Sequence, residues 1–440
     1  MWRALKPVHA PVPAEPIGAE EFARAMEPFA LNHTSLGLAV SGGPDSMALA
    51  WSAKQWAKDR GVTLHALIVD HNLRLESASE AAETQKNLSL LGIKSEVLRW
   101  EHAPIVARLH STARTARYKL LLEACRKNAL SCLLLAHQQE DQAETILMRL
   151  AKGTGIDGLA GIAAEKKKDG IRLLRPLLTF SKERLIATCK SARIPFITDP
   201  SNHSEKFARG RLRRVMPLLA EEGLTTDRLQ ELGTRASEAK EALDHYAHAL
   251  VRVATKQDCA GVVRFDLEHL RSAPIAVAGR AVVLCLNTLH REVYSPEYAS
   301  LDRLLRALRH DAEMTPCTLQ GCLISRTATQ AVFMREYSAI QDAVVIKPGE
   351  KIEWDGRWQI TLAATANESY AVRPLGNPPH ETVDILAPHL RHRLPQGRAR
   401  AALPALWRGN DLVLIPVFSA ENNAKNPATA VLSKPWPPSF

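Results

Sequence analysis

The chain has 440 residues, 46% of them hydrophobic and 24% charged, which is typical of a soluble globular protein with two or three domains. A formal net charge of +10 favours a polyanionic partner such as a nucleic acid. The seven cysteines form no C-x-x-C pair, which excludes a zinc knuckle or an iron–sulfur site of that spacing. With neither a signal peptide nor an apolar run long enough to span a membrane, we expect a cytoplasmic protein.

The N-terminal half alternates apolar strands with amphipathic helices. We expect residues 1–34 to be a lead-in that is proline-rich over 5–18, and LGLAV from Leu36 to be a buried strand that a helix follows. Ser77 and Glu80 have capping-box spacing, which predicts a second helix starting near Ser77. Further strands are predicted at 63–70, 95–100 and 131–137, and a further helix at 111–129. Four successive βα units predict an α/β fold whose parallel sheet carries helices on both faces.

The turn between the first strand and its helix has the sequence SGGPDS. Its residues are Ser41, Gly42, Gly43, Pro44, Asp45 and Ser46. A glycine-rich turn at a helix start presents backbone N–H groups and the positive end of the helix dipole to an anion. The two hydroxyls and the carboxylate suit a phosphate chain that carries a divalent metal. The turn lacks the spacing of a Walker loop, and the alternative is a plain connection between strand and helix.

Other polar residues follow strand ends in the same way. Asp70 and His71 follow the second strand, and His137 follows the fourth. Ligands of parallel sheets bind at the carboxyl ends of strands, so these residues and the SGGPDS turn are expected at one rim.

His137, Asp141 and Glu144 follow an i, i+4, i+7 spacing at the start of the next helix. They can therefore lie along one stripe. A solvated acidic first turn, which the helix dipole favours, and a metal site are the alternatives. Because the stripe starts at the rim of the phosphate turn, we expect its two carboxylates to hold the ammonium group of a cationic substrate.

The pattern of predicted elements changes in the second half of the chain. A fifth strand is predicted at 171–178 and a helix from Ser181, with a polar loop at Lys166 between the fourth and fifth strands. Residues 208–310 read as helices, and short β-branched runs return from about 316. We expect a catalytic domain at 35–215, a helical region at 216–315 and a β-rich module at 316–440.

The order of motifs resembles that of the tRNA(Ile)-lysidine synthases, members of the PP-loop ATP pyrophosphatase superfamily. The motifs are SGGPDSMAL (41–49), VDHNLR (69–74), ARTARY (113–118), HQQEDQAET (137–145), GTGIDGLAGI (153–162), RPLL (175–178) and DPSN (199–202). The resemblance is continuous from about 35 to 215 and looser beyond it.

This resemblance implies a two-step ligation on a tRNA(Ile) with the anticodon CAU. ATP adenylates O2 of the cytidine at the first anticodon position, with loss of diphosphate. An amino group of free lysine then attacks C2 and expels AMP, which leaves lysidine, a base that pairs with A instead of G.

The resemblance also implies roles for single residues. Ser41, Gly42, Gly43, Pro44, Asp45, Ser46, Asp70 and His71 would bind ATP, and Asp45 would place Mg²⁺. Arg114 and Arg117 would steady the developing phosphate charge, unless they form only an exposed basic helix face. His137 would lie near the adenylate, and Asp141 and Glu144 would bind lysine and help remove a proton from its amine. The chain departs from many members at Gln138, Gln139 and Glu140, where a second His or an Asp is common.

A basic cluster is the candidate tRNA contact. It consists of Arg209, Arg211, Arg213 and Arg214. A solvated basic helix start is the alternative, although such a start is electrostatically unfavourable without a partner. Further candidates in the C-terminal module are Arg357, Trp358, Arg373, Arg391, Arg393, Arg398 and Arg400.

Three other functions make different demands on the sequence. A tRNA thiolase of the same fold needs a cysteine pair or cluster beside the nucleotide, and an amide-forming relative needs a glutaminase domain. An inactive RNA-binding module predicts loss of Asp45, Asp141 or Glu144, all of which are present. Self-association as a homodimer is left open.

Overall fold

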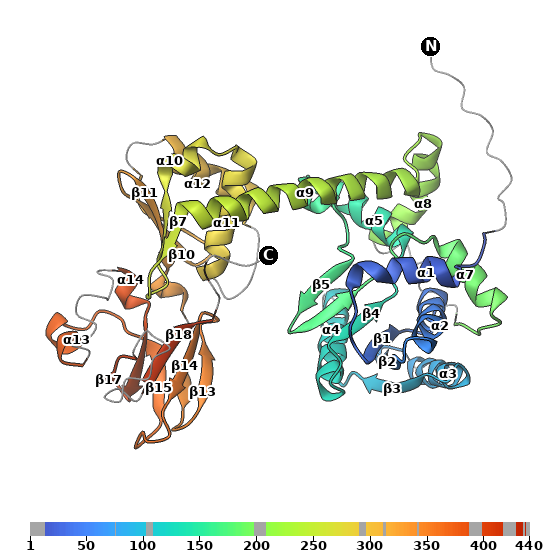
Figure 1. The fold of residues 1–440 in the computed structure, drawn as a ribbon, viewed down its shortest axis with the longest axis horizontal. Coiled ribbons are helices and arrows are strands. Elements are labelled where there is room, and N and C mark those ends of the chain that lie inside the picture. Colours follow the sequence, from blue (N-terminus) through green and yellow to red (C-terminus); the bar gives the residue numbers. More distant parts are fainter. Residues whose placement is uncertain are drawn as a thin grey trace, which may run out of the picture. The chain divides into compact units, whose positions relative to one another are not determined.

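The computed structural model describes residues 14–74, 76–102, 109–197, 208–289, 296–310, 314–340, 343–386, 398–416, 428–433 and 436 (Figure 1). The chain forms two compact units, Met1–Lys240 and Glu241–Phe440. The domain boundaries expected at 215 and 315 stay a prediction. No helix in the described ranges is long and apolar enough to cross a membrane.

The first unit is built on a six-stranded sheet with the order β3-β2-β1-β4-β6-β5. Its strands are β1 (Ser35–Val40), β2 (Thr63–Asp70), β3 (Lys94–Arg99), β4 (Cys132–Leu135), β5 (Glu165–Lys168) and β6 (Ile171–Leu174). All neighbours are parallel except β5, which runs antiparallel to β6. The predicted parallel α/β sheet is confirmed.

The helices of this unit connect the strands. They are α1 (Ala19–Met26), α2 (Pro44–Lys58), α3 (Ser77–Leu90), α4 (Leu109–Lys127), α5 (Gln139–Leu150), α6 (Ile156–Leu159), α7 (Lys182–Ser191) and α8 (Ala208–Glu221), with the 3₁₀ turn η1 (Glu27–Phe29). The long helix α9 (Thr226–Ala254) starts in this unit and ends in the second.

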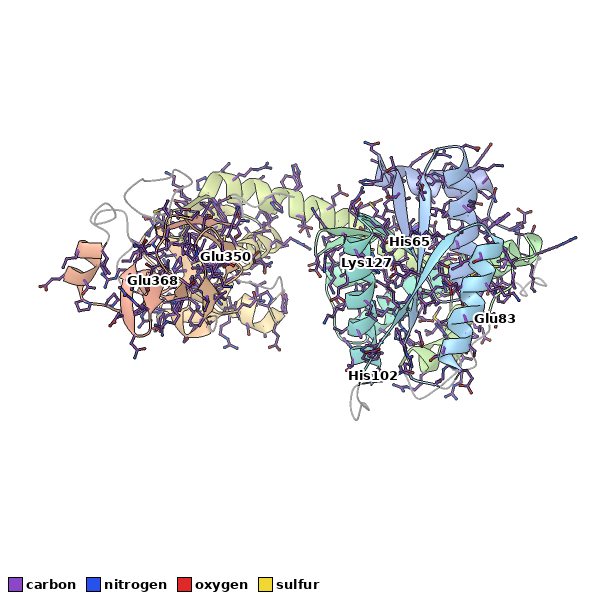
Figure 2. The ribbon with its side chains drawn as sticks, turned by 90° about the horizontal axis from the view of Figure 1, so that it is seen from below. His65, Glu83, His102, Lys127, Glu350 and Glu368 are labelled. Atoms are coloured by element: carbon purple, nitrogen blue, oxygen red, sulfur yellow. The ribbon has the colours of Figure 1, made fainter. Side chains whose placement is uncertain are left out.

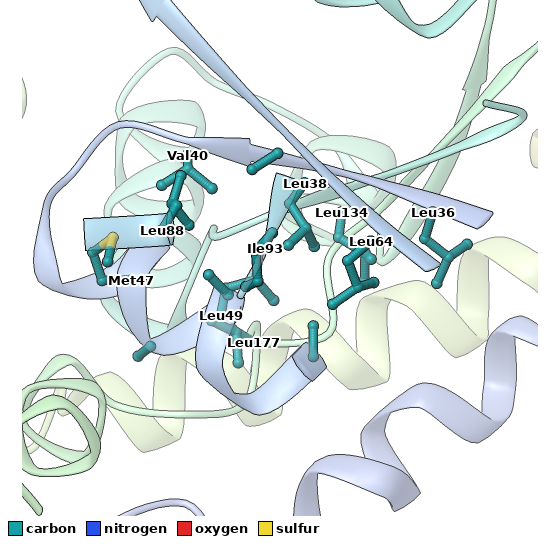
Figure 3. Packing of buried hydrophobic residues seen from close by; sticks show 14 of the residues in the cluster. Leu36, Leu38, Val40, Met47, Leu49, Leu64, Leu88, Ile93, Leu134 and Leu177 are labelled. Carbon is teal, nitrogen blue, oxygen red and sulfur yellow. The ribbon is translucent and has the colours of Figure 1, made fainter. Parts of the chain in front are cut away.

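The alternation of side chains along β1 explains why helices cover both sheet faces. Leu36, Leu38 and Val40 point to a core that α1, α2, α3 and α7 complete (Figure 3). Ala39 points to the opposite face, where the cluster includes Leu121 of α4. Lys127 at the end of α4 donates to Glu96 of β3 at 2.9 Å, which ties that helix to the sheet (Figure 2).

Three local expectations were wrong. Residues 1–34 include α1 and η1, whose Phe22, Met26 and Phe29 are buried in the core, so this segment is more than a lead-in. The helix α3 begins at Ser77 as predicted, but the capping box is not formed: Glu76 and not Ser77 is the N-cap residue, and the carboxylate of Glu80 accepts a bond from Arg74 at 3.1 Å. Lys166 lies in the edge strand β5 and not in a loop, because residues 165–168 pair with β6 across a tight turn.

The second unit combines helices with three antiparallel sheets. The sheet orders are β7-β8-β11-β10-β9, β12-β15-β16-β17 and β13-β14-β18. The strands are β7 (Thr255–Gln257), β8 (Val263–Asp266), β9 (Cys317–Leu319), β10 (Cys322–Arg326), β11 (Gln330–Arg335), β12 (Val344–Ile346), β13 (Lys351–Trp354), β14 (Trp358–Leu362), β15 (Tyr370–Pro374), β16 (Pro404–Arg408), β17 (Asp411–Leu414) and β18 (Ala428–Leu432). The helices are α10 (Leu267–Ser272), α11 (Ile275–Leu289), α12 (Tyr298–His310), α13 (His380–Leu386) and α14 (Arg398–Ala401), with the 3₁₀ turn η3 (Tyr337–Ala339).

The β-rich C-terminal part is confirmed, and the region expected to be helical differs in one place. The strands β7 and β8 interrupt it because Val263 and Phe265 alternate with polar residues and pair with β11. A buried ion network fixes the second unit. Asp355 accepts bonds from Arg335 at 2.9 Å and 3.0 Å and from Arg357 at 2.6 Å, and all three side chains are buried.

Candidate active site

The SGGPDS turn is closed by its own hydroxyls. The backbone N–H of Ser41 donates to Oγ of Ser46 at 3.1 Å, and that hydroxyl donates to the carbonyl of Gly43 at 3.0 Å. Gly43 is the N-cap of α2 and Pro44 follows it, so no side chain of the described residues caps this helix. The N–H groups of the first turn therefore remain for an outside acceptor such as a phosphate.

Gly42 is required by the geometry of the turn. Its φ is +84°, a left-handed conformation that favours glycine, and a Cβ there would lie 2.3 Å from Oγ1 of Thr84. The carbonyl of Gly42 accepts a bond from the N–H of Ile197 at 2.9 Å. The turn is thus held between α3 and the segment after α7.

Asp45 lies half-buried in the first turn of α2. Burial raises the pKa of this carboxyl to about 6, with nearby charges of Lys182, Asp141 and Arg213 acting in both directions. Its Oδ1 is buried and has no hydrogen-bond partner within the described part of the chain. A buried, unsatisfied oxygen of this kind is explained by a missing donor or cation.

The start of α5 forms a capping box that the sequence did not predict. The side chain of Gln138, the N-cap residue, accepts a bond from the N–H of Glu140 at 2.5 Å, and Asp141 accepts one from the N–H of Gln138 at 3.3 Å. Glu140 in turn accepts from the N–H of Lys182 at 3.0 Å and 3.2 Å, which joins α5 to the start of α7. Burial, followed by the charges of Glu183 and Asp45, raises the pKa of Glu140 to about 7.

Glu144 is buried and faces two arginines of α8. Its Oε1 accepts a bond from Nε of Arg213 at 2.5 Å, and its Oε2 lies 3.8 Å from Nε of Arg209. That second oxygen is buried without a hydrogen-bond partner among the residues that the structure describes. Two members of the predicted tRNA-binding cluster therefore contact the carboxylate predicted to bind lysine.

His137 is surrounded by positive charge. Burial lowers its pKa to about 3, and the charges of Arg175, Arg114, Arg117 and Arg209 act in the same direction. The imidazole is therefore neutral at physiological pH, and it can donate one hydrogen bond and accept another without adding a charge to the site. Its Nδ1 is buried and lacks a partner in the described ranges.

Arg175 is a site residue to which sequence reasoning gave no role. It is 7% exposed, donates to the carbonyl of Ala163 at 2.8 Å, and keeps a buried Nε without a partner among the described residues. The signal was present in the RPLL motif, which begins with this arginine after strand β6. Burial lowers the pKa of Arg117 and of Arg175, and both guanidiniums remain cations at neutral pH.

Asp70 is the last residue of β2, and His71 follows it. Asp70 is buried and accepts a bond from the N–H of Asn72 at 2.9 Å. Burial, followed by the charge of Arg117, lowers the pKa of His71, whose Nδ1 has no partner in the described part of the chain. Its ring meets that of Trp100 edge to face.

The glycine-rich segment 153–162 is braced by α5. Gln142 donates to the carbonyl of Ile162 at 3.0 Å and accepts from its N–H at 2.5 Å. Arg149 donates to the carbonyls of Gly158 and Gly161 at 3.1 Å and 2.6 Å. These contacts hold the glycine-rich segment against α5, the helix that carries Glu144.

Other candidates are placed differently. Arg211 and Arg214 lie exposed on α8, each with further contacts of its own. Arg357 and Trp358 are buried in the second unit, so neither side chain reaches a ligand there, and the expectation of RNA contacts is wrong for them. The DPSN motif, Arg391 and Arg393 lie outside the described residues.

Comparison with known proteins gives the family. Residues 15–219 match the model of a PP-loop domain. The chain is 34% identical over 390 residues to a tRNA(Ile)-lysidine synthase of Ruegeria pomeroyi, covering 88% of this chain and 89% of that protein. It is 46% identical over 344 residues to the enzyme of that name from a Bradyrhizobium species, with 76% and 95% covered, and 40% identical over 310 residues to that of Rhodopseudomonas palustris, with 68% and 89% covered. This chain belongs to the tRNA(Ile)-lysidine synthase family, and its first unit contains the ATP-binding PP-loop domain.

Proposed function

We propose that this enzyme joins lysine to C2 of the cytidine at the first position of the CAU anticodon of tRNA(Ile). The observation that carries the proposal is a set of buried polar atoms without hydrogen-bond partners in the described part of the chain. They are Oδ1 of Asp45, Nδ1 of His71, Nδ1 of His137, Oε2 of Glu144 and Nε of Arg175. Buried polar atoms are normally bonded, so a set that gathers at one rim indicates a ligand with both anionic and cationic groups.

In the first step, O2 of the cytidine attacks the α-phosphorus of ATP and diphosphate leaves. The N–H groups at the start of α2 and the hydroxyls of Ser41 and Ser46 bind the phosphates. Arg114, Arg117 and Arg175 supply positive charge where negative charge develops on the phosphate. A neutral His137 orients the nucleotide by hydrogen bonding.

Asp45 is the residue that we assign to Mg²⁺. Its unsatisfied oxygen fits a metal that binds through one or two carboxylates and the phosphates of its substrate. No cluster of three or more His, Cys, Asp or Glu side chains suited to a metal occurs among the described residues, which is compatible with binding of this kind. When bound, Mg²⁺ would neutralise charge on the phosphates.

In the second step, an amino group of lysine attacks C2, the bond from C2 to the adenylated oxygen breaks, and AMP leaves. We assign the lysine ammonium to Oε2 of Glu144, which lies buried without a hydrogen-bond partner in the described ranges. Asp141 caps α5 and so places Glu144 one turn further along the helix. The amine must be neutral to attack, and we assign one of these carboxylates as the base that accepts its proton.

A tRNA thiolase of this fold is the weaker alternative. The cysteine beside the nucleotide turn is Cys189, whose thiol donates to the carbonyl of Pro44 at 3.4 Å. Burial raises the pKa of this thiol to about 12, so it is not the thiolate that sulfur chemistry needs. All seven cysteines are free, which supports a cytoplasmic location. A homodimer stays a prediction.

The test is incorporation of lysine into RNA. We expect the protein to transfer labelled lysine to a CAU transcript of tRNA(Ile) with ATP and Mg²⁺, with one AMP formed for each lysine incorporated. AMP formation that does not depend on the transcript, or the absence of label in the RNA, would contradict the proposal. A transcript with the first anticodon cytidine replaced by uridine is the matched control and should accept no lysine.

A further inference from the structure

A patch of positive charge lies outside the site, at the free edge of the sheet. Among the strands that the structure describes, β5 pairs with β6 alone, and all four of its residues are exposed. Three of them are lysines, Lys166, Lys167 and Lys168. Lysines on an edge strand also prevent strands of different molecules from pairing, which is the structural alternative to a binding role.

The two faces of β5 differ in charge. Lys167 pairs across the strands with Arg172, which Glu165 neutralises through bonds of 2.6 Å and 2.8 Å. Lys166 and Lys168 face the other side, together with Leu173 and Ile171, which pack against α4. The positive charge is therefore compensated on one face only.

Lys168 meets α4 through an aromatic ring. Its Nζ lies 5.4 Å from the ring centroid of Tyr118, and Cζ of Arg114 lies 5.3 Å from the same centroid. Neither cation forms an ion pair with another described residue. The nearby carboxylate of Asp169 is already engaged by Arg126 at 3.6 Å. A ring shared by two exposed cations offsets their repulsion only weakly, at about 0.5–1 kcal/mol for each contact.

The patch is continuous with the active site. Arg114 is one of the cations that lower the pKa of His137, and Tyr118 is close enough to Arg175 to raise the pKa of that guanidinium against the effect of burial. A line of unpaired or partly paired cations therefore runs from β5 over α4 to the site of the target cytidine. A ligand that binds along this line would carry several negative charges in a row, as the phosphates of a nucleic acid backbone do.

We propose that the α4-facing side of β5, formed by Lys166 and Lys168 with Tyr118 and Arg114, contacts the tRNA backbone beside the target cytidine. This assignment rests on the proposed function and adds the path by which the RNA reaches the site. The contact is electrostatic and independent of base sequence, and it orients the anticodon loop.

The experiment measures the affinity of the full-length protein for the CAU transcript of tRNA(Ile) as a function of KCl concentration. The test variants are Lys168→Gln and the double variant Lys166→Gln/Lys168→Gln. The matched control is Lys167→Gln, which removes the same charge from the opposite face of the same strand. Each phosphate contact contributes about 0.7–0.9 to the slope of log K against log salt.

We expect the double variant to lower that slope by roughly 1–2, and to bind the transcript about tenfold more weakly near 50 mM salt. Lys167→Gln should keep the wild-type slope. The proposal is overturned if the double variant and Lys167→Gln have equal slopes, whether both match the wild type or both fall.

Lysine incorporation by the wild-type protein is measured on the same samples. If the wild-type protein incorporates lysine while the slopes do not separate, only this inference fails. If the wild-type protein incorporates no lysine, the proposed function itself fails. Unchanged ATP affinity in the double variant excludes a misfolded site as the cause of weaker RNA binding.

Discussion

Nε of Arg213 lies 2.5 Å from Oε1 of the buried Glu144. The arginine-rich helix α8 therefore contacts the carboxylate to which we assign the binding of lysine. The contact joins residues 69 positions apart in the chain. It leaves the second oxygen of Glu144 without a hydrogen-bond partner among the described residues. Arg213 thus binds one oxygen of the carboxylate, and the other oxygen, which lies 3.8 Å from Nε of Arg209, is the one to which we assign the ammonium of the substrate.

Glu144→Gln separates the two steps. The amide keeps the size of the side chain but removes the charge that binds an ammonium, so we expect adenylation of the tRNA to continue and lysine transfer to fall at least 100-fold. The two steps are measured as diphosphate release and lysine incorporation. Equal loss of both activities would contradict the assignment of Glu144 to lysine, and Glu123→Gln on the exposed face of α4 serves as the control.

Gly42→Ala should abolish ATP binding. The new Cβ would lie 2.3 Å from Oγ1 of Thr84 at a φ of +84°, so the turn must move away from its place before α2. ATP affinity is measured directly, for example by calorimetry. Gly61→Ala is the matched control, because it has φ +64° and nothing within 4 Å of the added Cβ. Equal ATP affinity in both variants would show that the shape of the turn does not matter.

Glu140→Gln tests how the raised pKa of Glu140 affects the stability of the folded protein. Burial raises the pKa of Glu140 from 4.5 to about 7, so the folded protein holds a proton that the unfolded chain has lost in this range. Stability therefore falls as the pH rises from about 4.5 to 7, and the lost stability is not regained above it.

We expect the ligand-free Glu140→Gln protein to melt a few degrees above the wild type at about pH 8, and with a weaker pH dependence. The amide oxygen still accepts the N–H of Lys182. Glu83→Gln, at an exposed position of α3 (Figure 2), should leave the melting curve unchanged. A lower melting temperature for Glu140→Gln at alkaline pH would contradict the raised pKa.

Asp355→Asn should destabilise the second unit. The substitution leaves the guanidiniums of Arg335 and Arg357 buried without a counter-charge, which costs about 3–5 kcal/mol for pairs of this kind. Denaturant unfolding measures the loss, and Glu353→Gln on the exposed side of β13 is the control. A loss below about 1 kcal/mol would mean that water reaches the network.

Much of the first unit could be predicted from local patterns. The buried strands, the helix after SGGPDS and the common rim of Asp45, Asp70 and His137 follow from periodicity and from the rule for parallel sheets. The edge strand β5 was not predicted, because its lysines show no hydrophobic alternation and the strand forms only by pairing with β6. The capping box of α3 was predicted wrongly because the N-cap is Glu76, one residue before the serine on which the pattern depends.

The parts of the site that could not be predicted depend on contacts across the fold. Arg175 becomes a site residue only because the end of β6 lies next to that of β4. The contact between Glu144 and Arg213 requires α8 to pack on α5, which no local pattern encodes. Local sequence patterns predict which helix or strand carries each charged residue, but they do not predict which charged residues of different elements form pairs.

The most direct test of the account is whether label from ATP enters the tRNA before lysine is added. The enzyme is incubated with a CAU transcript of tRNA(Ile), Mg²⁺ and ATP labelled at the α-phosphate, and the RNA is then isolated. The account predicts labelled RNA in the absence of lysine, and release of the label as AMP when lysine is added. Unlabelled RNA together with lysine incorporation would contradict an adenylated cytidine, and with it the role given to the SGGPDS turn.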